Sequence, residues 1–85
     1  MARTVMVVLI GNRLEAAEKV QKILTGWGCL IKTRLGLHDG VLDNCTERGL
    51  VILELVGTDE QKKELQHKLS LVQGVAVQTV SLSVD

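Results

Sequence analysis

The sequence predicts an α+β fold whose elements follow the order strand, helix, strand, strand, helix, strand. Two runs, Val5 to Ile10 and Leu50 to Val56, are almost continuously apolar, as expected for strands at the centre of a sheet. Two other segments place apolar residues at helical spacing, and each follows a residue that favours a helix N-terminus. No proline or low-complexity linker interrupts the 85 residues, so residues 1–85 are expected to form one domain.

The first strand and the first helix are predicted from the residues around Gly11. Residues 3–10 are mostly β-branched and apolar, which is typical of a strand, and Gly11 ends this run. Asn12 is a favourable N-cap, and Glu15 completes a capping-box pattern. A helix is therefore expected, with its apolar residues at Ala16, Val20, Ile23, Leu24 and Trp27.

The second strand is predicted to follow the end of this helix at Gly26 and Gly28. It covers residues 29–37, and a polar loop over residues 38–47 comes after it. Because side chains alternate along a strand, one face is expected to carry Ile31, Thr33 and Leu35, and the other Lys32 and Arg34.

The second half of the chain repeats the pattern of a strand, a helix and a strand. The third strand is predicted over residues 48–56, and Thr58 then caps a helix with Gln61 in the capping-box position. Gly74 ends that segment, and residues 75–84 form the last strand. The helix has a narrow apolar stripe, made of Leu65, Leu69 and Val72.

This order of elements is the ferredoxin-like arrangement, a four-stranded antiparallel sheet with two helices on one face. The first and third strands are its centre, which agrees with their apolar runs. In the third strand, parity places Val51, Leu53 and Leu55 on one face and Leu50, Ile52, Glu54 and Val56 on the other. We expect the face with Glu54 to point away from the helices. The first strand adds to that face either Met6, Val8 and Ile10 or Val5, Val7 and Leu9.

The face away from the helices is thus expected to be apolar over several hundred Å², which is large for a monomer. A second copy of the chain is the expected cover, giving a homodimer or a tetramer joined through the sheets. The hairpin register predicts Lys32, or after a two-residue slip Arg34, opposite Glu54. The predicted interface residues are therefore Leu50, Ile52, Glu54 and Lys32.

Composition and charge exclude several classes of protein. Ten basic residues balance ten acidic ones, so neither nucleic acid nor an anionic membrane is an expected partner. Trp27 is the single aromatic residue, whereas RNA-binding sheets need several stacking aromatics. Cys29 and Cys45 form no Cys-x-x-Cys pair, which favours a reducing, cytoplasmic environment. The first apolar run is too short to span a bilayer, and no secretory cleavage pattern follows it.

Two stretches resemble a known family. One is the run over residues 12–24, which reads Asn-Arg-x-x-Ala-Ala-Glu-Lys-Val-x-x-Ile-Leu and is followed by Gly28, Ile31, Arg34 and Gly36. The other covers residues 68–79 and reads Lys-Leu-x-x-Val-x-Gly-Val-x-Val-x-Thr. Together they resemble the small ACT-like iron-only hydrogenase system regulators. The resemblance implies the fold of ACT domains and of the metal-sensing domain of the nickel-responsive repressor, oligomers joined through sheets, and a regulatory role.

A small-ligand site is one hypothesis for the turn after the first strand. Gly11, Asn12 and Arg13 lie at the amino end of the first helix, where backbone amides and the helix dipole favour a carboxylate or phosphate. ACT domains, which the chain resembles, often bind amino acids beside this turn at a subunit interface, and Arg34 is the fourth candidate residue. The alternative is that the three turn residues only end the strand and cap the helix.

A metal site is the second hypothesis, because His38 and Cys45 bracket the polar loop and are suitable ligands for zinc, nickel or copper. The resemblance does not support it, since Gly36 stands where the nickel-responsive repressor has its first His. A small acylphosphatase-type enzyme is a third hypothesis, with Arg13 near the phosphate-binding turn. No catalytic set of residues is evident. The sequence therefore favours a non-catalytic regulatory or ligand-sensing module without a cofactor.

Overall fold

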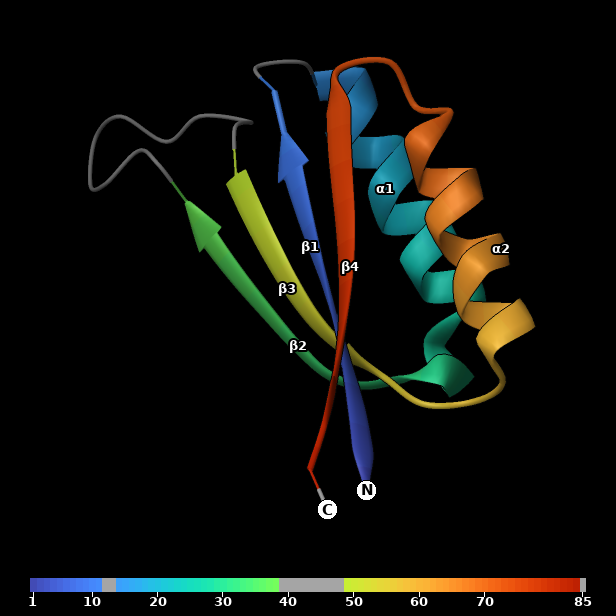
Figure 1. Ribbon diagram of the computed structural model, residues 1–85. Helices are drawn as coiled ribbons and strands as arrows, with labels where there is room; N and C mark the ends of the chain where they lie inside the picture. Colours follow the sequence, from blue (N-terminus) through green and yellow to red (C-terminus); the bar gives the residue numbers. More distant parts are fainter. Residues whose placement is uncertain (12–13, 39–48, 85) are drawn as a thin grey trace.

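The computed structural model describes residues 1–11, 14–38 and 49–84. Its elements follow the predicted order, which confirms the α+β fold (Figure 1). Both helices cover the same face of one antiparallel four-stranded sheet, whose strand order is β2-β3-β1-β4. The elements are β1 (Ala2–Ile10), α1 (Leu14–Gly26), the 3₁₀ turn η1 (Gly28–Leu30), β2 (Ile31–His38), β3 (Gly49–Leu55), α2 (Asp59–Ser70) and β4 (Val75–Ser83).

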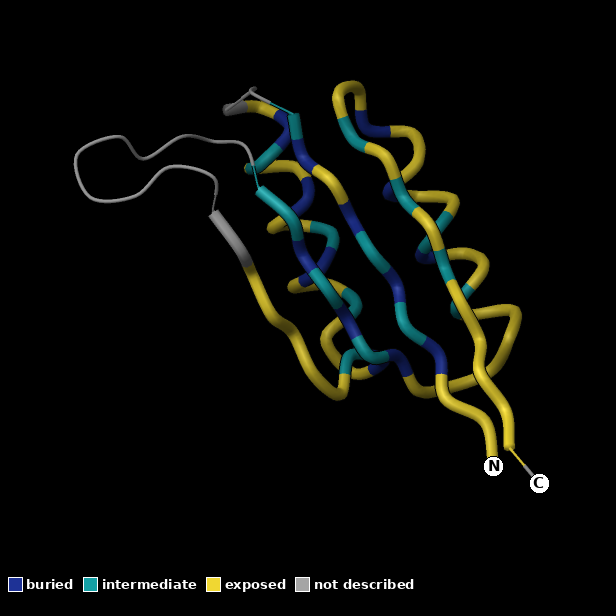
Figure 2. Tube along the Cα trace, turned by 60° about the vertical axis from the view of Figure 1, so that its left-hand side comes forward, coloured by how far each residue is buried: buried dark blue, intermediate teal, exposed yellow. Residues whose placement is uncertain are grey.

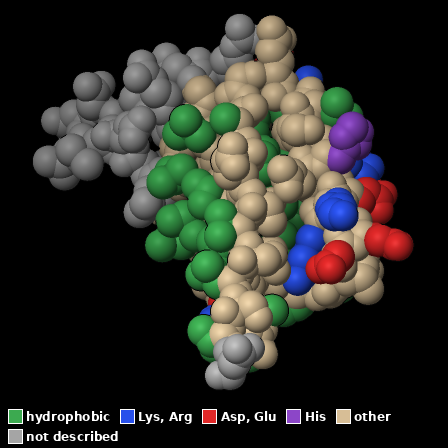
Figure 3. All heavy atoms as spheres, viewed as in Figure 1, with side chains coloured by type: hydrophobic (Ala, Val, Ile, Leu, Met, Phe, Trp, Pro, Cys, Tyr) green, Lys and Arg blue, Asp and Glu red, His purple; other side chains and the backbone are tan. Residues whose placement is uncertain are grey.

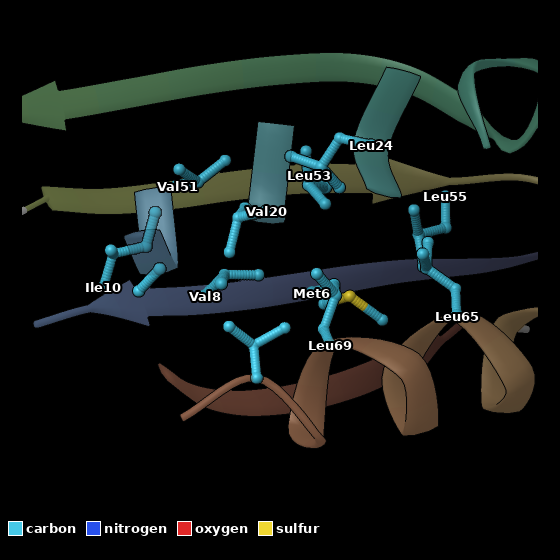
Figure 4. Close-up of a cluster of buried hydrophobic side chains, with 12 residues drawn as sticks. Met6, Val8, Ile10, Val20, Leu24, Val51, Leu53, Leu55, Leu65 and Leu69 are labelled. Carbon is cyan, nitrogen blue, oxygen red and sulfur yellow. The ribbon is translucent and has the colours of Figure 1, made fainter. Parts of the chain in front are cut away.

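The hydrophobic core lies between the two central strands and the two helices (Figure 4). In β3 the buried side chains are Val51, Leu53 and Leu55, as the parity of that strand predicts. In β1 they are Met6, Val8 and Ile10. Of the two arrangements predicted for β1, the one with Val5, Val7 and Leu9 on the face away from the helices is therefore confirmed. The helices complete the core with Ala16, Val20, Leu24, Leu65 and Leu69.

Local capping fixes the start of α2 as predicted. The Gln61 amide N–H donates to Thr58 Oγ1 at 3.1 Å, and the Thr58 N–H donates to Gln61 Oε1 at 2.9 Å, which confirms the capping box. Gly57 precedes it with φ +105, a conformation that favours glycine, and a Cβ there would lie 2.6 Å from Leu30 Cδ2. The two α-helices have 13 and 12 residues, and neither is long and apolar enough to cross a membrane.

The second strand differs from its prediction in two ways. Residues 28–30 form a 3₁₀ turn, so the strand begins at Ile31 and not at Cys29. The register with β3 then shifts between Ile31 and Thr33, which leaves Lys32 as the extra residue of a β-bulge. Because a bulge reverses the parity of the residues after it, the faces predicted for Thr33, Leu35 and Arg34 are wrong.

Candidate functional site

The face of the sheet away from the helices is the most distinctive surface of the described residues, and we call it the open face. Strand pairing places on it Arg3, Val5, Val7, Leu9, Thr33, Leu35, Leu50, Ile52, Glu54, Ala76, Gln78, Val80 and Leu82. Four of its large apolar residues are 47–63% exposed, namely Leu9, Leu35, Val80 and Leu82. Figure 2 looks onto this face, with the helices behind the strands. In Figure 3 hydrophobic side chains gather on the sheet side and charged ones on the helix side.

One ion pair lies within the open face, between β1 and β3. Arg3 Nε donates to Glu54 Oε2 and Arg3 Nη2 donates to Glu54 Oε1, each at 2.6 Å, so the contact is bidentate. The Glu54 side chain is 16% exposed, whereas that of Arg3 is 58% exposed. The hydrogen bond from Arg3 holds the pKa of the Glu54 carboxyl below its usual value, against the desolvation of the carboxyl, and the charges of Arg3 and Lys32 add to this effect. The same contact raises the pKa of Arg3.

The partner of Glu54 corrects the prediction from the hairpin register. Thr33, and neither Lys32 nor Arg34, stands opposite Glu54, because the bulge shifts the pairing by one residue. Arg34 lies on the helix-covered face and donates from Nη2 to Gln21 Oε1 of α1. Lys32 contributes only its charge. Sequence reasoning missed Arg3, although its position two residues before Val5 already places it on the same face of β1.

A shallow hollow of about 300 Å³ lies beside the ion pair. Arg3 and Glu54 form its polar part, and the ends of β1 and β4 form its apolar part, through Met1, Val5, Leu82 and Val84. Nε and Nη2 of Arg3 bond Glu54, and the guanidinium has further N–H donors. The lining of the hollow therefore combines apolar surface with a charged pair.

The turn predicted as a ligand site is described only in part. The Gly11 N–H donates to the Gly74 carbonyl at 2.8 Å, and a Cβ on Gly11 would lie 3.1 Å from that oxygen. This close approach gives Gly11 a structural reason to be glycine. Asn12 and Arg13 lie outside the described residues, so the ligand site at this turn stays a prediction.

The metal site at His38 and Cys45 also stays a prediction. His38 is the last residue of β2, and Cys45 lies outside the described residues. Within the described ranges no group of three or more His, Cys, Asp or Glu side chains is placed to hold a metal ion. Of the predicted interface residues, Leu50, Ile52 and Glu54 lie on the open face, and Lys32 lies at the bulge beside it.

A second hollow, of about 330 Å³, lies on the helix side between α2 and β4. Lys62 Nζ donates to Thr4 Oγ1 at 2.9 Å, and that hydroxyl also lies 3.2 Å from Ser81 Oγ. Thr4 is 4% exposed, and these contacts satisfy its hydroxyl at the border of the core. The arrangement thus has a packing role.

Comparisons with known proteins identify the fold. No protein-family model matches the sequence, and no curated protein matches it. Among solved structures, the uncharacterized protein TM1266 from Thermotoga maritima is 24% identical, with a TM-score of 0.81 over 98% of this chain and 100% of that one. The ACT domain of GTP pyrophosphokinase from Chlorobium tepidum is 16% identical, with a TM-score of 0.63 over 94% and 97% of the two chains.

A third solved structure extends the comparison to another kind of regulator. CPII, a nitrogen regulatory PII-like protein from Thiomonas intermedia K12 solved with ADP, AMP and bicarbonate, is 11% identical, with a TM-score of 0.58 over 100% of this chain and 97% of that one. At such identities the likeness concerns the fold. The chain therefore has the ferredoxin-like α+β fold of ACT and ACT-like domains.

Proposed function

We propose that this chain is a non-catalytic regulatory module that self-associates through the open face of its sheet and responds to a small ligand. The observation that carries the proposal is that, apart from the Arg3–Glu54 ion pair, the open face is largely apolar, and that several of its large side chains are exposed. Neither α1 nor α2 covers this face, since both lie on the other side (Figure 1). A reducing cytoplasm is the environment favoured by a sequence whose two cysteines form no Cys-x-x-Cys pair.

A second copy of the chain is the partner that suits this face. Covering several hundred Å² of apolar surface at about 25 cal/mol per Å² gives several kcal/mol per subunit before the cost of association. Arg3 and Glu54 neutralise each other, so two copies of the face do not repel each other by net charge. A closed two-fold arrangement pairs a patch with itself, and a patch without net charge is compatible with that.

The ligand-responsive part of the proposal is supported by the fold and by the hollow beside Arg3. The ACT domain of GTP pyrophosphokinase and the PII-like protein share this fold, and both come from regulatory systems or enzymes that handle nucleotides. The sequence resemblance to the iron-only hydrogenase system regulators adds the narrower proposal that this module regulates such a system. A ligand at the border of the open face would change the stability of the assembly, which is how an inert module transmits a signal.

Self-association is tested by measuring mass with light scattering at micromolar protein. The wild type should have at least twice the mass of the chain. Ile52→Asp places a charge in the middle of the open face and should weaken assembly strongly. Lys63→Asp, on an exposed position of α2, is the matched control and should leave the mass unchanged. A monomeric wild type, or equal effects of the two substitutions, would refute the proposal.

Ligand response is tested by thermal unfolding of the purified protein with amino acids, nucleotides and divalent metals. A ligand at one hundred times its Kd stabilises the native state by about 2.7 kcal/mol, which shifts the midpoint measurably. We expect an organic effector to raise the midpoint and to change the mass of the assembly. Stabilisation by nickel or zinc alone, lost in both His38→Ala and Cys45→Ala, would favour the metal-sensor alternative instead. Acyl phosphate hydrolysis abolished by Arg13→Ala would favour the enzyme.

A further inference from the structure

The two edges of the sheet are built in opposite ways. The β2 edge has a bulge at Lys32 and carries a second cation at Arg34, which are features that prevent an edge strand from pairing with another chain. The β4 edge has nine residues without a charge or a proline, and it pairs with β1 in unbroken register from Ala2–Ser83 to Ile10–Val75. A long, regular, uncharged edge strand is a template for a further strand.

Hydrogen bonds at the two ends of β4 show which backbone groups face outward. The Gly11 N–H donates to the Gly74 carbonyl at 2.8 Å, and the Val84 N–H donates to the Met1 carbonyl at 3.2 Å. Antiparallel pairs alternate between hydrogen-bonded and non-hydrogen-bonded, so the even-numbered residues of β4 bond β1. The odd-numbered residues turn their N–H and C=O groups away from β1.

Four residues therefore present backbone donors and acceptors at the free edge, namely Val77, Thr79, Ser81 and Ser83. Val75 differs from them because its N–H donates to the Val72 carbonyl at 3.3 Å. Neither helix crosses in front of β4 in Figure 1, where this strand lies nearest the viewer. In Figure 3, drawn from the same side, backbone and polar atoms of this strand are visible between the green sheet face and the helix side.

We propose that two copies of the chain join antiparallel through their β4 edges, which makes one continuous sheet of both molecules. The register follows from the four residues that turn their backbone groups outward. A two-fold axis at Val80 is the one position that places each of these residues opposite another of them in the second copy. In that register Val77 faces Ser83 of the second copy and Thr79 faces Ser81 of the second copy. Moving the axis to Thr79 or to Ser81 pairs only three of the four.

This pairing also accounts for the side chains beside the edge. Directly opposite residues share a face, so Val80 meets Val80 of the second copy, and Gln78 meets its Leu82, all on the open face. Val80 and Leu82 are 47% and 63% exposed in the single chain, and the second copy covers part of both. The two open faces become one apolar surface with all helices on the other side. The inference rests on the proposed self-association and adds a second contact to it. The β4 edges join two copies, and the open faces of such pairs then pack on each other, so Ile52→Asp acts on the second contact alone.

Disulfide cross-linking tests the register, in a background where Cys29 and Cys45 are replaced by serine. Val80→Cys places two thiols across the axis in a non-hydrogen-bonded pair, where Cα atoms are about 4.5 Å apart and a disulfide fits. Gln78→Cys is the matched control on the same strand and face, but its copies lie four residues apart along the strand, about 13 Å. Oxidation should link Val80→Cys into a dimer at least about tenfold faster than Gln78→Cys. Equal or reversed rates would overturn the inference.

A second substitution separates edge pairing from packing of the open faces. Ser81→Pro removes an outward N–H and leaves the backbone hydrogen bonds to β1 intact, because proline is tolerated on a free edge. It also removes the Ser81 hydroxyl, and Lys62 Nζ then remains as the partner of Thr4 Oγ1. Combined with Val80→Cys, it should slow cross-linking by about tenfold or more, while Ile52→Asp should leave cross-linking unchanged. The reverse pattern would assign Val80 to a face contact and refute edge pairing. A wild type that is monomeric would instead refute the proposed function itself.

Discussion

The two faces of β1 have similar side chains and different surroundings. Met6 and Val8 are completely buried under the helices, whereas Val5 and Val7 are only half-buried and Leu9 is 54% exposed. Strand propensity and hydrophobicity are nearly the same on both faces. What differs is the partner, because the helices cover one face and nothing within the described residues covers the other. An apolar sequence therefore indicates that both faces of a strand can be buried. It does not indicate which face is buried within the chain itself.

The polar residues at the start of β1 repeat this contrast. Thr4 lies on the covered face, and its hydroxyl is satisfied within the chain by Lys62 and Ser81. Arg3, its neighbour, lies on the open face and forms the ion pair with Glu54. A small hydroxyl suits the border of a core, since its hydrogen bonds are easily supplied. A paired charge suits a surface that another molecule can cover without an unpaired ion being buried.

The largest expected difference between the two faces is in the free energy of unfolding after two neighbouring residues of β3, one on each face, are truncated. Leu53→Ala opens a cavity in the core and should lower the free energy of unfolding by about 2–5 kcal/mol. Ile52→Ala removes a half-buried side chain from the open face and should cost about 1 kcal/mol in the dissociated chain. Urea unfolding measured by circular dichroism gives both values.

Protein concentration sharpens this test, because assembly stabilises the native state by mass action. The cost of Ile52→Ala should grow as the protein concentration rises, while the cost of Leu53→Ala should stay constant. Equal costs at every concentration would show that the open face has no partner. The contrast between the two faces would then reduce to a difference in exposure alone.

A smaller effect is expected from the pH dependence of the Arg3–Glu54 pair. The pKa of Glu54 is lowered in the folded protein, chiefly by its hydrogen bond from Arg3. A carboxyl of this kind stabilises the fold above its unfolded pKa of 4.5, and the stabilisation is lost as the pH falls through the lower folded pKa. The free energy of unfolding of the wild type should therefore approach that of Glu54→Gln in acid.

The control for this measurement is Glu64→Gln, at an exposed position of α2. The free energy of unfolding of Glu64→Gln should differ from that of the wild type by an amount that changes little between neutral and acidic pH. The corresponding difference for Glu54→Gln should change more. If the two variants follow the same profile, the ion pair does not contribute in solution. Arg3→Gln in place of Glu54→Gln should give a similar profile, because either substitution removes the pair.

Much of the fold follows from local chemistry that the sequence states directly. The capping box at Thr58, the end of α1 at Gly26 and the order of the elements needed no information beyond neighbouring residues. The covered face of β3 was also predictable, because Glu54 marks the other face of an otherwise apolar strand. These features depend on periodicity and on contacts between residues close in sequence.

The tertiary structure decided what depends on register. The bulge at Lys32 has no local signal, since it adjusts β2 to its neighbour, and it moves Arg34 to the helix side. The hydrogen-bond partner of Glu54 is Arg3, which is 51 residues away in the sequence. The cation that pairs with Glu54 therefore lies on β1 and not on β2. The same register assigns Val5, Val7 and Leu9 to the open face. By itself the sequence determined the elements and their apolar faces, whereas strand pairing determined which side chains meet, because pairing is set by contacts across the whole sheet.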